Sequence, residues 1–410
     1  MEEKITQGIQ FKLPQDKTEH LIKVIGVGGG GGNAVRSMYE RGVKNVSFAY
    51  CNTDSQALAN SPIPVRVQLG EEGLGVGGNP EKGRAAAEES IEDVNRLFDD
   101  GTKMVFLTAG MGGGTGTGAA PLIAKTARDK GILTVGVVTL PFRFEKRARI
   151  ENALVGVEEL KKNVDSLLVI NNERLLEIYS DTMLSIVEGF SKANDILTVA
   201  TKTVSEVITI EGIITRDFKD VETVMKDGGG AIVTVGYGSG EKRVIKAMND
   251  ALNSPLLNTK DIEKAQRLLY IIYTCDEKPV SIPELGEINQ FMDSLSDDLE
   301  VLWGLYHDDT IGEQVKVAVV ATGFDKEREQ KKDAEDKSET IKRLWNLYYP
   351  DSNASVQEEP EPQEEPNNGE EEPSVEILDS EVKDTDTNLR GKGQSWLNRF
   401  VNFVKSTLEE

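Results

Sequence analysis

The sequence is poor in cysteine and histidine, two side chains that proteins often use for metal binding and catalysis. Its 410 residues include only two cysteines and two histidines. Cys51 and Cys275 lie in apolar runs that read as buried strands, so they suit a reducing compartment and predict neither a disulfide framework nor a metal cluster. His20 and His307 lie outside every glycine-rich motif. Acidic residues are therefore the remaining candidates for handling protons or water.

Long apolar stretches and an excess of basic residues are also missing. No apolar run is long enough to span a bilayer, and the first twenty residues lack the apolar segment of a signal peptide. The formal net charge of −23 argues against nucleic acid as a partner, because affinity for phosphate backbones comes from clustered lysine and arginine. We therefore expect a cytoplasmic protein without transmembrane insertion.

Glycine, in contrast, is concentrated in three short runs. The most informative is GMGGGTGTGAAP, residues 110–121, which directly follows the apolar run Met104 to Leu107. A loop with few side chains can turn its backbone N–H groups inward around phosphate oxygens, and threonine hydroxyls add further donors. This run predicts a phosphate loop made of Gly112, Gly113, Gly114, Thr115, Gly116, Thr117 and Gly118.

A second glycine run follows the strand expected at Leu21 to Val27 and opens a helix that ends near Gly42. A strand, a glycine turn and a helix together place an anion on a helix N-terminus, where unpaired N–H groups and the macrodipole favour negative charge. The phosphate-binding residues predicted here are Gly28, Gly29, Gly30, Gly31, Gly32 and Asn33. The same segment fits GxGxxG, with Asp54 at the distance of a ribose-binding carboxylate, so an NAD-dependent oxidoreductase is one alternative.

The third run contains Gly73, Gly75, Gly77 and Gly78, so three loops could surround one polyphosphate. The lysine of a Walker A motif is absent, because neither GxxxxGKS nor GxxxxGKT occurs in the sequence. We expect backbone dipoles and a metal ion, Mg²⁺, to neutralise the phosphate charge instead.

Apolar runs alternate with helical stretches between residues 21 and 180, and this pattern predicts a parallel sheet covered on both faces. The glycine loops then lie at the carboxyl ends of the strands, where such sheets bind ligands. Residues 181–212 read as one long central helix. Further strands and helices are expected between residues 213 and 325. The fold class is therefore α/β, with a doubly wound nucleotide domain and a smaller second α/β domain.

The composition changes after Phe324. Residues 326–394 are highly charged, with a marginal helix possible before Tyr349 and an acidic, proline-rich stretch from Glu358 to Glu381 that predicts a disordered linker. Residues 395–410 place apolar side chains along one face of a helix. This favours docking to a partner protein over direct contact with lipid or no function.

The order and spacing of these motifs resemble the tubulin/FtsZ family of GTPases, and within it the bacterial cell-division members. The resemblance covers about Leu21 to Phe324 and rests on IKVIGVGGGGGNAV, CNTDSQAL, GLGVGGNPEKGR, GMGGGTGTGAAP, LPFRFEKRAR, KANDIL and GIITRDFKDVETVM. It implies a tubulin-like fold, GTP binding and hydrolysis with Mg²⁺, head-to-tail polymerisation and a place in the midcell division ring. It also implies that the C-terminal peptide binds membrane-anchoring and regulatory division proteins, although the family's proline-containing, dibasic pattern is absent.

The same resemblance implies a role for each loop. The first loop would contact the α- and β-phosphates, the second would wrap the remaining phosphates, and Gly77 and Gly78 would approach the γ-phosphate. Glu145 and Arg149 would contact ribose and phosphate, although their spacing also fits a surface ion pair. Asn172 would contact the sugar or the base.

Guanine recognition is implied by the KAND motif on the long helix. An amide beside a carboxylate, as in Asn194 and Asp195, offers the donors and acceptors that match the O6, N1 and N2 edge of guanine. Phe190, one turn earlier, would stack on the base.

Asp217 and Asp220 in TRDFKD are the catalytic residues that the resemblance implies. They would reach across a head-to-tail contact and orient the water that attacks the γ-phosphate of the next subunit. Without the resemblance, Asp217 could simply cap a helix. Thr215, Arg216 and Lys219 depart from the family pattern, so a GTP-gated scaffold with little hydrolysis is a further alternative.

Overall fold

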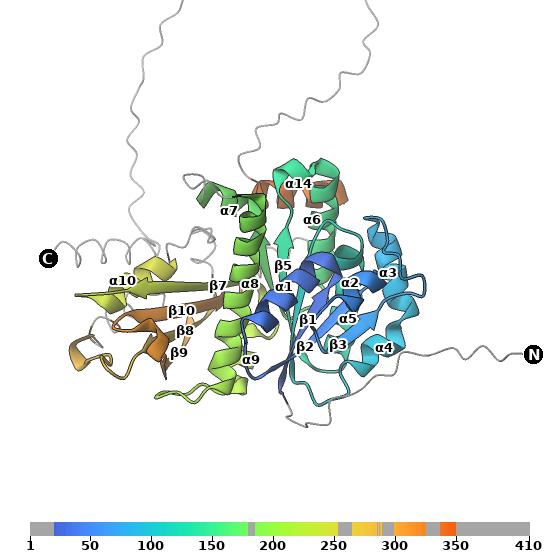
Figure 1. Ribbon diagram of the computed structural model, residues 1–410. Helices are drawn as coiled ribbons and strands as arrows, with labels where there is room; N and C mark the ends of the chain where they lie inside the picture. Colours follow the sequence, from blue (N-terminus) through green and yellow to red (C-terminus); the bar gives the residue numbers. More distant parts are fainter. Residues whose placement is uncertain are drawn as a thin grey trace, which may run out of the picture.

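One mixed β-sheet connects all the strands that the structure describes (Figure 1). This computed structural model describes residues 20–178, 185–252, 265–284, 286, 288, 299–324 and 337–349. The strands are β1 (Ile22–Val27), β2 (Val46–Asn52), β3 (Val65–Gln68), β4 (Met104–Gly110), β5 (Leu133–Leu140), β6 (Ser166–Asn171), β7 (Gly229–Gly238), β8 (Arg267–Thr274), β9 (Glu300–His307) and β10 (Val315–Thr322). Their order in the sheet is β3-β2-β1-β4-β5-β6-β7-β10-β8-β9.

Helices cover both faces of this sheet. They are α1 (Gly28–Glu40), α2 (Ser55–Ala59), α3 (Pro80–Glu89), α4 (Ile91–Arg96), α5 (Thr115–Asp129), α6 (Arg147–Lys161), α7 (Asn172–Ile178), α8 (Ile186–Thr209), α9 (Phe218–Met225), α10 (Arg243–Leu252) and α14 (Lys337–Tyr348). Alternate residues of β1 fall into opposite cores: Val24 packs with α1, α8 and α9, whereas Ile25 packs with α5 and α6. This confirms the parallel, doubly covered sheet expected from the continuous apolar runs.

The second half continues the same sheet. β6 pairs in parallel with β7 from Ser166↔Gly229 to Leu168↔Ala231, and β7 then pairs antiparallel with β10. A third core lies between this part of the sheet and α10. The long helix α8 runs between the two halves (Figure 1). β3 and β9 were not expected, because β3 is only four residues long and β9 contains polar and glycine positions.

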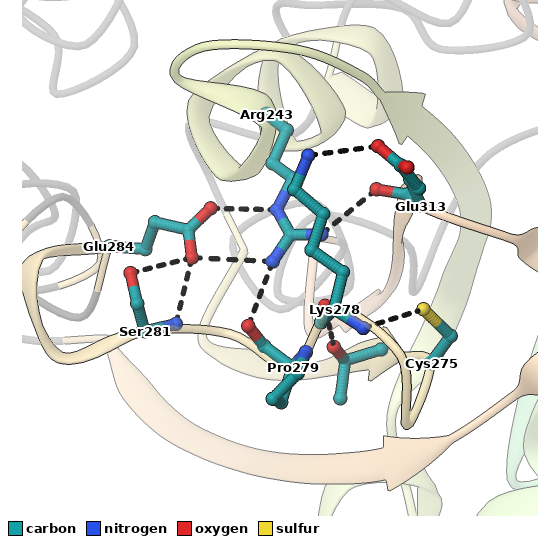
Figure 2. A network of polar contacts seen from close by, with 8 residues as sticks. Arg243, Cys275, Lys278, Pro279, Ser281, Glu284 and Glu313 are labelled. Carbon is teal, nitrogen blue, oxygen red and sulfur yellow. Dashed lines mark hydrogen bonds and ion pairs between the residues drawn. The ribbon is translucent and has the colours of Figure 1, made fainter.

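A buried arginine organises the outer end of the second half (Figure 2). Arg243, 1% exposed, donates from Nε to Glu284 Oε1 at 2.7 Å and from its terminal nitrogens to the carbonyl oxygens of Pro279 and Glu313. Ser281 donates its backbone N–H and its hydroxyl to Glu284 Oε2. Burial by itself would raise the pKa of Glu284, but the hydrogen bonds from Arg243 and Ser281 outweigh it and lower that pKa to about 2.

The helix α14 is more firmly attached than the sequence indicated. The sequence predicted a charged linker with, at most, a marginal helix around its few apolar residues, yet Leu344 is 4% exposed and packs in the same core as α5 and α6. The expectations for residues 1–19, for the acidic stretch and for residues 395–410 lie outside the described residues.

Candidate nucleotide site

The first two glycine loops lie together at the carboxyl ends of two neighbouring strands. β1 and β4 are parallel neighbours and end in register, with Val27 opposite Ala109. A Cβ atom added at Gly28 would lie 2.8 Å from the backbone nitrogen of Gly116, so the two loops are in contact. The structure therefore brings together the two loops that the sequence predicts to hold phosphates.

The first loop forms the N-terminal turns of α1. Val27, the N-cap residue, has no polar side chain, and the first turn contains no acidic residue. The first N–H groups of a helix have no partner within the helix, so this end can receive an anion. Gly29, Gly30 and Asn33 are exposed there. Gly31 has a different role, because its Cβ would lie 2.3 Å from the carbonyl oxygen of Thr108.

The threonines of the second loop hold the loop itself. Thr117 Oγ1 accepts a hydrogen bond from the backbone N–H of Gly112 at 2.8 Å, and Gly112 has a φ of 95° that favours glycine. The hydroxyl of Thr115 lies 2.7 Å from that of Thr53. Both loop threonines are buried. The sequence predicted these hydroxyls as phosphate donors, and in the structure they also fix the loop.

Close packing explains several glycines of the second loop. A Cβ at Gly118 would lie 1.9 Å from the carbonyl oxygen of Pro80, and one at Gly114 would lie 2.4 Å from Val76 Cγ2. Gly116 faces the carbonyl oxygen of Gly110 in the same way, at 2.7 Å. Gly113 has open space around its Cβ position. The sequence pattern did not separate glycines that permit packing from glycines that permit ligand approach.

The third loop adopts a left-handed backbone. Gly75, Gly77 and Gly78 have φ values of 75°, 57° and 78°, with nothing within 4 Å of their Cβ positions. Asp54 faces the same loop through a bridge to Leu74. Its Oδ1 accepts from the backbone N–H groups of Gln56 and Ala57, so Asp54 caps α2. This local role accounts for a carboxylate at the position that the sequence suggested for ribose binding.

The proposed base contacts lie on α8, beside α1. Phe190 is 42% exposed and meets the ring of Phe142 edge-on, with 5.0 Å between the ring centroids. Asp195 forms an ion pair with Arg41, at the C-terminal end of α1, and Asn194 is partly buried. Sequence reasoning missed both Arg41 and Phe142. The sequence contains one signal for Phe142, its position within the motif LPFRFEKRAR, and none for Arg41.

The loop after β5 connects this base-side cluster to the start of α6. Glu145 Oε1 accepts from the backbone N–H of Phe142 at 2.9 Å, while its Oε2 lies 3.0 Å from Arg149 Nε. The ion pair that the spacing allowed is thus present, and Arg149 remains half exposed. Asn172 follows β6 and is 4% exposed, and none of the described residues forms a hydrogen bond with its buried Oδ1. An acceptor of this kind is available to a ligand donor.

Asp217 and Asp220 lie far from all three loops. They begin α9, beyond the end of α8, and the stretch of α8 from Phe190 to Thr209 alone spans roughly 28 Å at 1.5 Å per residue (Figure 1). Asp217 Oδ1 accepts from the backbone N–H of Asp220 at 2.9 Å, and Asp220 Oδ2 accepts from that of Asp217 at 3.2 Å. This reciprocal cap holds both carboxylates rigidly and leaves each with a second oxygen.

The two cations beside these acids contact groups of their own subunit, and for Arg216 these include Asp220 itself. Arg216 donates from Nε to the carbonyl oxygen of Trp303 at 2.5 Å and lies 3.6 Å from Asp220 Oδ2. Lys219 forms an ion pair with Glu222, three residues further along α9. Both cations are therefore tied to their own subunit.

Among the residues that the structure describes, no group of three or more histidine, cysteine or acidic side chains could hold a metal ion. None of the described helices combines the length and apolar character that crossing a membrane requires. Cys51 and Cys275 are both buried free thiols, as expected, and burial raises the pKa of Cys51 to about 12.

Two family models match the chain. The GTPase domain of the Tubulin/FtsZ family matches residues 21–180, and the C-terminal domain of the FtsZ family matches residues 229–325. The cell division protein FtsZ of Porphyromonas gingivalis is 53% identical over 321 residues, covering 77% of this chain and 70% of that protein. This chain belongs to the FtsZ family. The FtsZ of Aquifex aeolicus is 41% identical, over 78% of this chain and 88% of its own length.

Solved structures agree with this assignment. The FtsZ dimer of M. jannaschii superposes with a TM-score of 0.68 at 38% identity, covering 75% of this chain and 89% of that one. CetZ2 from Haloferax volcanii, solved as a GTPγS-bound protofilament, shares the fold, with a TM-score of 0.63 at 20% identity over 78% of this chain and 96% of its own.

Membership of the FtsZ family establishes the class of activity. The protein is a cell-division GTPase of the cytoskeleton, it binds GTP, and proteins of its family form filaments. The oxidoreductase alternative is set aside, because the segment that carries GxGxxG belongs to the GTPase domain.

Proposed function

We propose that the three glycine loops hold the triphosphate of GTP and that α8 reads its base. The open N-terminus of α1, Gly113, and the left-handed Gly77 and Gly78 offer main-chain N–H groups without side chains in the way. Such groups favour anions. The remaining contacts of the proposed site come from Glu145, Arg149, Asn172, Phe190, Asn194 and Asp195. Asp195 would exchange its pairing with Arg41 for the guanine edge.

Mg²⁺ fits this site as an ion carried by the nucleotide. Main-chain N–H groups neutralise phosphates but cannot ligate a cation, and the described residues supply no cluster of carboxylates. Mg²⁺ commonly keeps several waters and binds substrate phosphates. When bound, it would neutralise charge on the β- and γ-phosphate oxygens. The protein's own contribution is to bind, orient and enclose the triphosphate.

Hydrolysis requires a second subunit in this proposal. The single observation that carries it is the separation of Asp217 and Asp220 from the loops by most of the length of α8. In a head-to-tail contact, their second carboxylate oxygens would accept hydrogen bonds from water and orient it toward the γ-phosphate, giving GDP and inorganic phosphate. The hydrogen bond of Arg216 to the carbonyl oxygen of Trp303 supports this role, since it holds that guanidinium on its own subunit.

The concentration dependence of turnover tests the shared site. Phosphate release per molecule should be near zero in dilute protein and rise steeply once filaments form, because no subunit can complete its own site. Sedimentation with GTP and with GDP, measured on the same samples, should show pelleting with GTP. A turnover per molecule that stays constant on dilution would contradict the proposal.

We further propose how the whole chain is divided. Residues 1–20 form an extension, 21–180 the GTP-binding domain, 181–212 the central helix and 213–325 the second domain. The charged segment 326–394 was expected to be a linker, but α14 within it is docked on the first half, so only the part after α14 and the peptide 395–410 would tether filaments to membrane-anchoring and regulatory division proteins. The protein would thereby act in the cytoplasm at the midcell ring. A head-to-tail contact between identical subunits builds an open filament whenever the rotation that relates them does not close a ring.

A further inference from the structure

The helix α14 follows the second half of the chain but lies on the first half. It comes after β10, which belongs to the outer part of the sheet, yet it packs beside α6 and near α7 (Figure 1). Leu344 and Tyr349 are 4% and 1% exposed within the core formed by α5 and α6. The contact is therefore a buried apolar interface within the subunit.

Polar contacts fix the C-terminal end of α14 on the strand ends of the nucleotide half. The hydroxyl of Tyr349 donates to the carbonyl oxygen of Pro141 at 2.7 Å, and Asn171 donates from its side chain to the carbonyl oxygen of Tyr348. Arg343 lies 3.7 Å from Glu158 of α6. Burial raises the pKa of Tyr349, so its hydroxyl keeps the proton that this hydrogen bond requires.

The loop that Tyr349 holds is the loop that carries part of the nucleotide site. Pro141 is followed by Phe142, whose ring meets Phe190 edge-on and whose backbone N–H binds Glu145. The guanidinium of Arg143 lies over the ring of Tyr349, 5.9 Å from its centroid. One short segment, residues 141–145, therefore contacts Tyr349, the residue directly after α14, on one side and the proposed base and ribose contacts on the other.

We propose that α14 is a positioning element of the nucleotide site and that its docking is coupled to nucleotide binding. Docked α14 holds residues 141–145 in the arrangement that places Phe190 and Glu145, so a subunit with α14 released binds nucleotide less tightly. Linkage makes the effect reciprocal: bound nucleotide must stabilise the docked helix by the same factor. Tyr349 acts through the loop and touches no nucleotide itself. The inference rests on the proposed roles of Glu145 and Phe190.

A matched pair of charge insertions tests this coupling in the full-length protein. Leu344→Asp places a carboxylate in the buried interface, whereas Asn346→Asp places one on the exposed side of the same helix, two residues away. The dissociation constant for GDP is measured by titration calorimetry after removal of bound nucleotide, so that assembly does not contribute. We expect Leu344→Asp to weaken GDP binding about 5- to 10-fold. Asn346→Asp should stay within about 2-fold of the wild type, as expected for an exposed substitution.

Two further variants distinguish positioning from general stability. Tyr349→Phe keeps the buried ring and removes only the hydrogen bond to Pro141, so it should weaken GDP binding by about 2- to 3-fold. Leu344→Met, which restores an apolar side chain of similar size, should recover the wild-type affinity. If Leu344→Asp does not fold, the test compares the GDP dissociation constants of Tyr349→Phe and the wild type, and equal constants would overturn the inference.

Hydrogen exchange supplies the reciprocal measurement. Saturating GDP should slow exchange of the α14 amides in the wild type and in Asn346→Asp. The inference would be overturned if a folded Leu344→Asp protein, with freely exchanging α14 amides, bound GDP as tightly as the wild type. It would also be overturned if saturating GDP left the exchange rates of the α14 amides in the wild type unchanged. A wild-type protein that binds neither GDP nor GTP would instead overturn the proposed function, which keeps the two failures distinct.

Discussion

The two halves of this protein build their polar sites from different materials. In the first half, the candidate phosphate site consists of main chain, with glycines where helices and loops approach one another and where a ligand would lie. In the second half, the polar centres are side chains: the buried Arg243 with Glu284, and the reciprocal cap of Asp217 and Asp220. The first half therefore depends on glycines, whose missing side chains leave room for close packing and for a ligand. The second half depends on particular charged side chains.

This difference predicts where substitutions act. Adding one methyl group in the first half should disturb packing wherever a neighbouring carbonyl already occupies the space. Removing one charge in the second half should have effects that depend on what the charge faces, either a buried partner or another subunit. Substitutions of both kinds can test whether the contrast holds.

The largest effect should come from Asp220→Ala. Loss of this carboxylate removes one of the two groups proposed to orient the attacking water, so we expect GTP turnover in assembled protein to fall about 100-fold. GTP affinity should remain unchanged, because the phosphate loops lie at the other end of α8. Steady-state phosphate release and equilibrium GTP binding measure the two quantities separately.

Glu222→Ala is the matched control for this substitution, since it removes another carboxylate of α9 only two residues away. It should keep turnover within about 3-fold of the wild type, because the pairs that Glu222 forms with Lys219 and Lys226 are at the surface, where ion pairs contribute little. A comparable loss in both variants would indicate that α9 charge in general, and not the position of Asp220, controls hydrolysis.

Glu284→Gln should lower the free energy of unfolding by about 3 kcal/mol, at the lower end of the range for breaking a buried ion pair. Arg243 then loses its ion pair with Glu284 while it stays buried, although the carbonyl oxygens of Pro279 and Glu313 still accept from it. Urea unfolding at pH 7, followed by circular dichroism, measures the change. An unaffected midpoint would mean that the side-chain network does not stabilise the second half.

The same residue predicts a pH dependence. The pKa of Glu284 is about 2 in the folded protein against an ordinary value of 4.5, so the unfolded chain binds more protons between these values. The stabilisation is complete above pH 4.5 and is lost as the pH falls toward 2. Unfolding measured across this range should show a smaller acid-induced loss of stability in Glu284→Gln than in the wild type.

Gly31→Ala and Gly29→Ala compare two positions of the first loop. The added Cβ at Gly31 would lie 2.3 Å from the carbonyl oxygen of Thr108, so we expect a loss of about 2 kcal/mol of stability. Gly29 has nothing within 4 Å, and alanine favours helix there, so the nucleotide-free protein should be unchanged or slightly more stable. Urea midpoints of the two nucleotide-free variants would be equal if the glycines served only ligand approach.

Much of the fold could be predicted from the sequence because its strongest signals are local. The apolar runs of β1, β4 and β5 and the long periodicity of α8 each lie within one element, and all four are present. β9 could not be predicted in the same way, since its stability comes from pairing with β8 and its sequence alternates poorly. The docking of α14 depends on a surface of α6 that is distant in sequence, so its charged composition was misleading.

The candidate site was predictable in its composition and less so in its geometry. The glycine loops could be located from the sequence, but the close packing of Gly114, Gly116 and Gly118 depends on neighbours brought in by α3 and β4. The local role of Asp54 as a helix cap and the engagement of Arg216 with β9 are likewise set by tertiary contacts. Patterns of residue types do not contain these distances.

The central claim is that one subunit supplies the nucleotide pocket and another supplies the acids. Its most direct test mixes Asp220→Ala, which keeps the pocket, with a variant carrying Asn194→Ala and Asp195→Ala, which keeps the acids. Each protein alone should release little phosphate from GTP, whereas the mixture should regain turnover at contacts that join an intact pocket to intact acids. A mixture no more active than the sum of its two components would contradict the account.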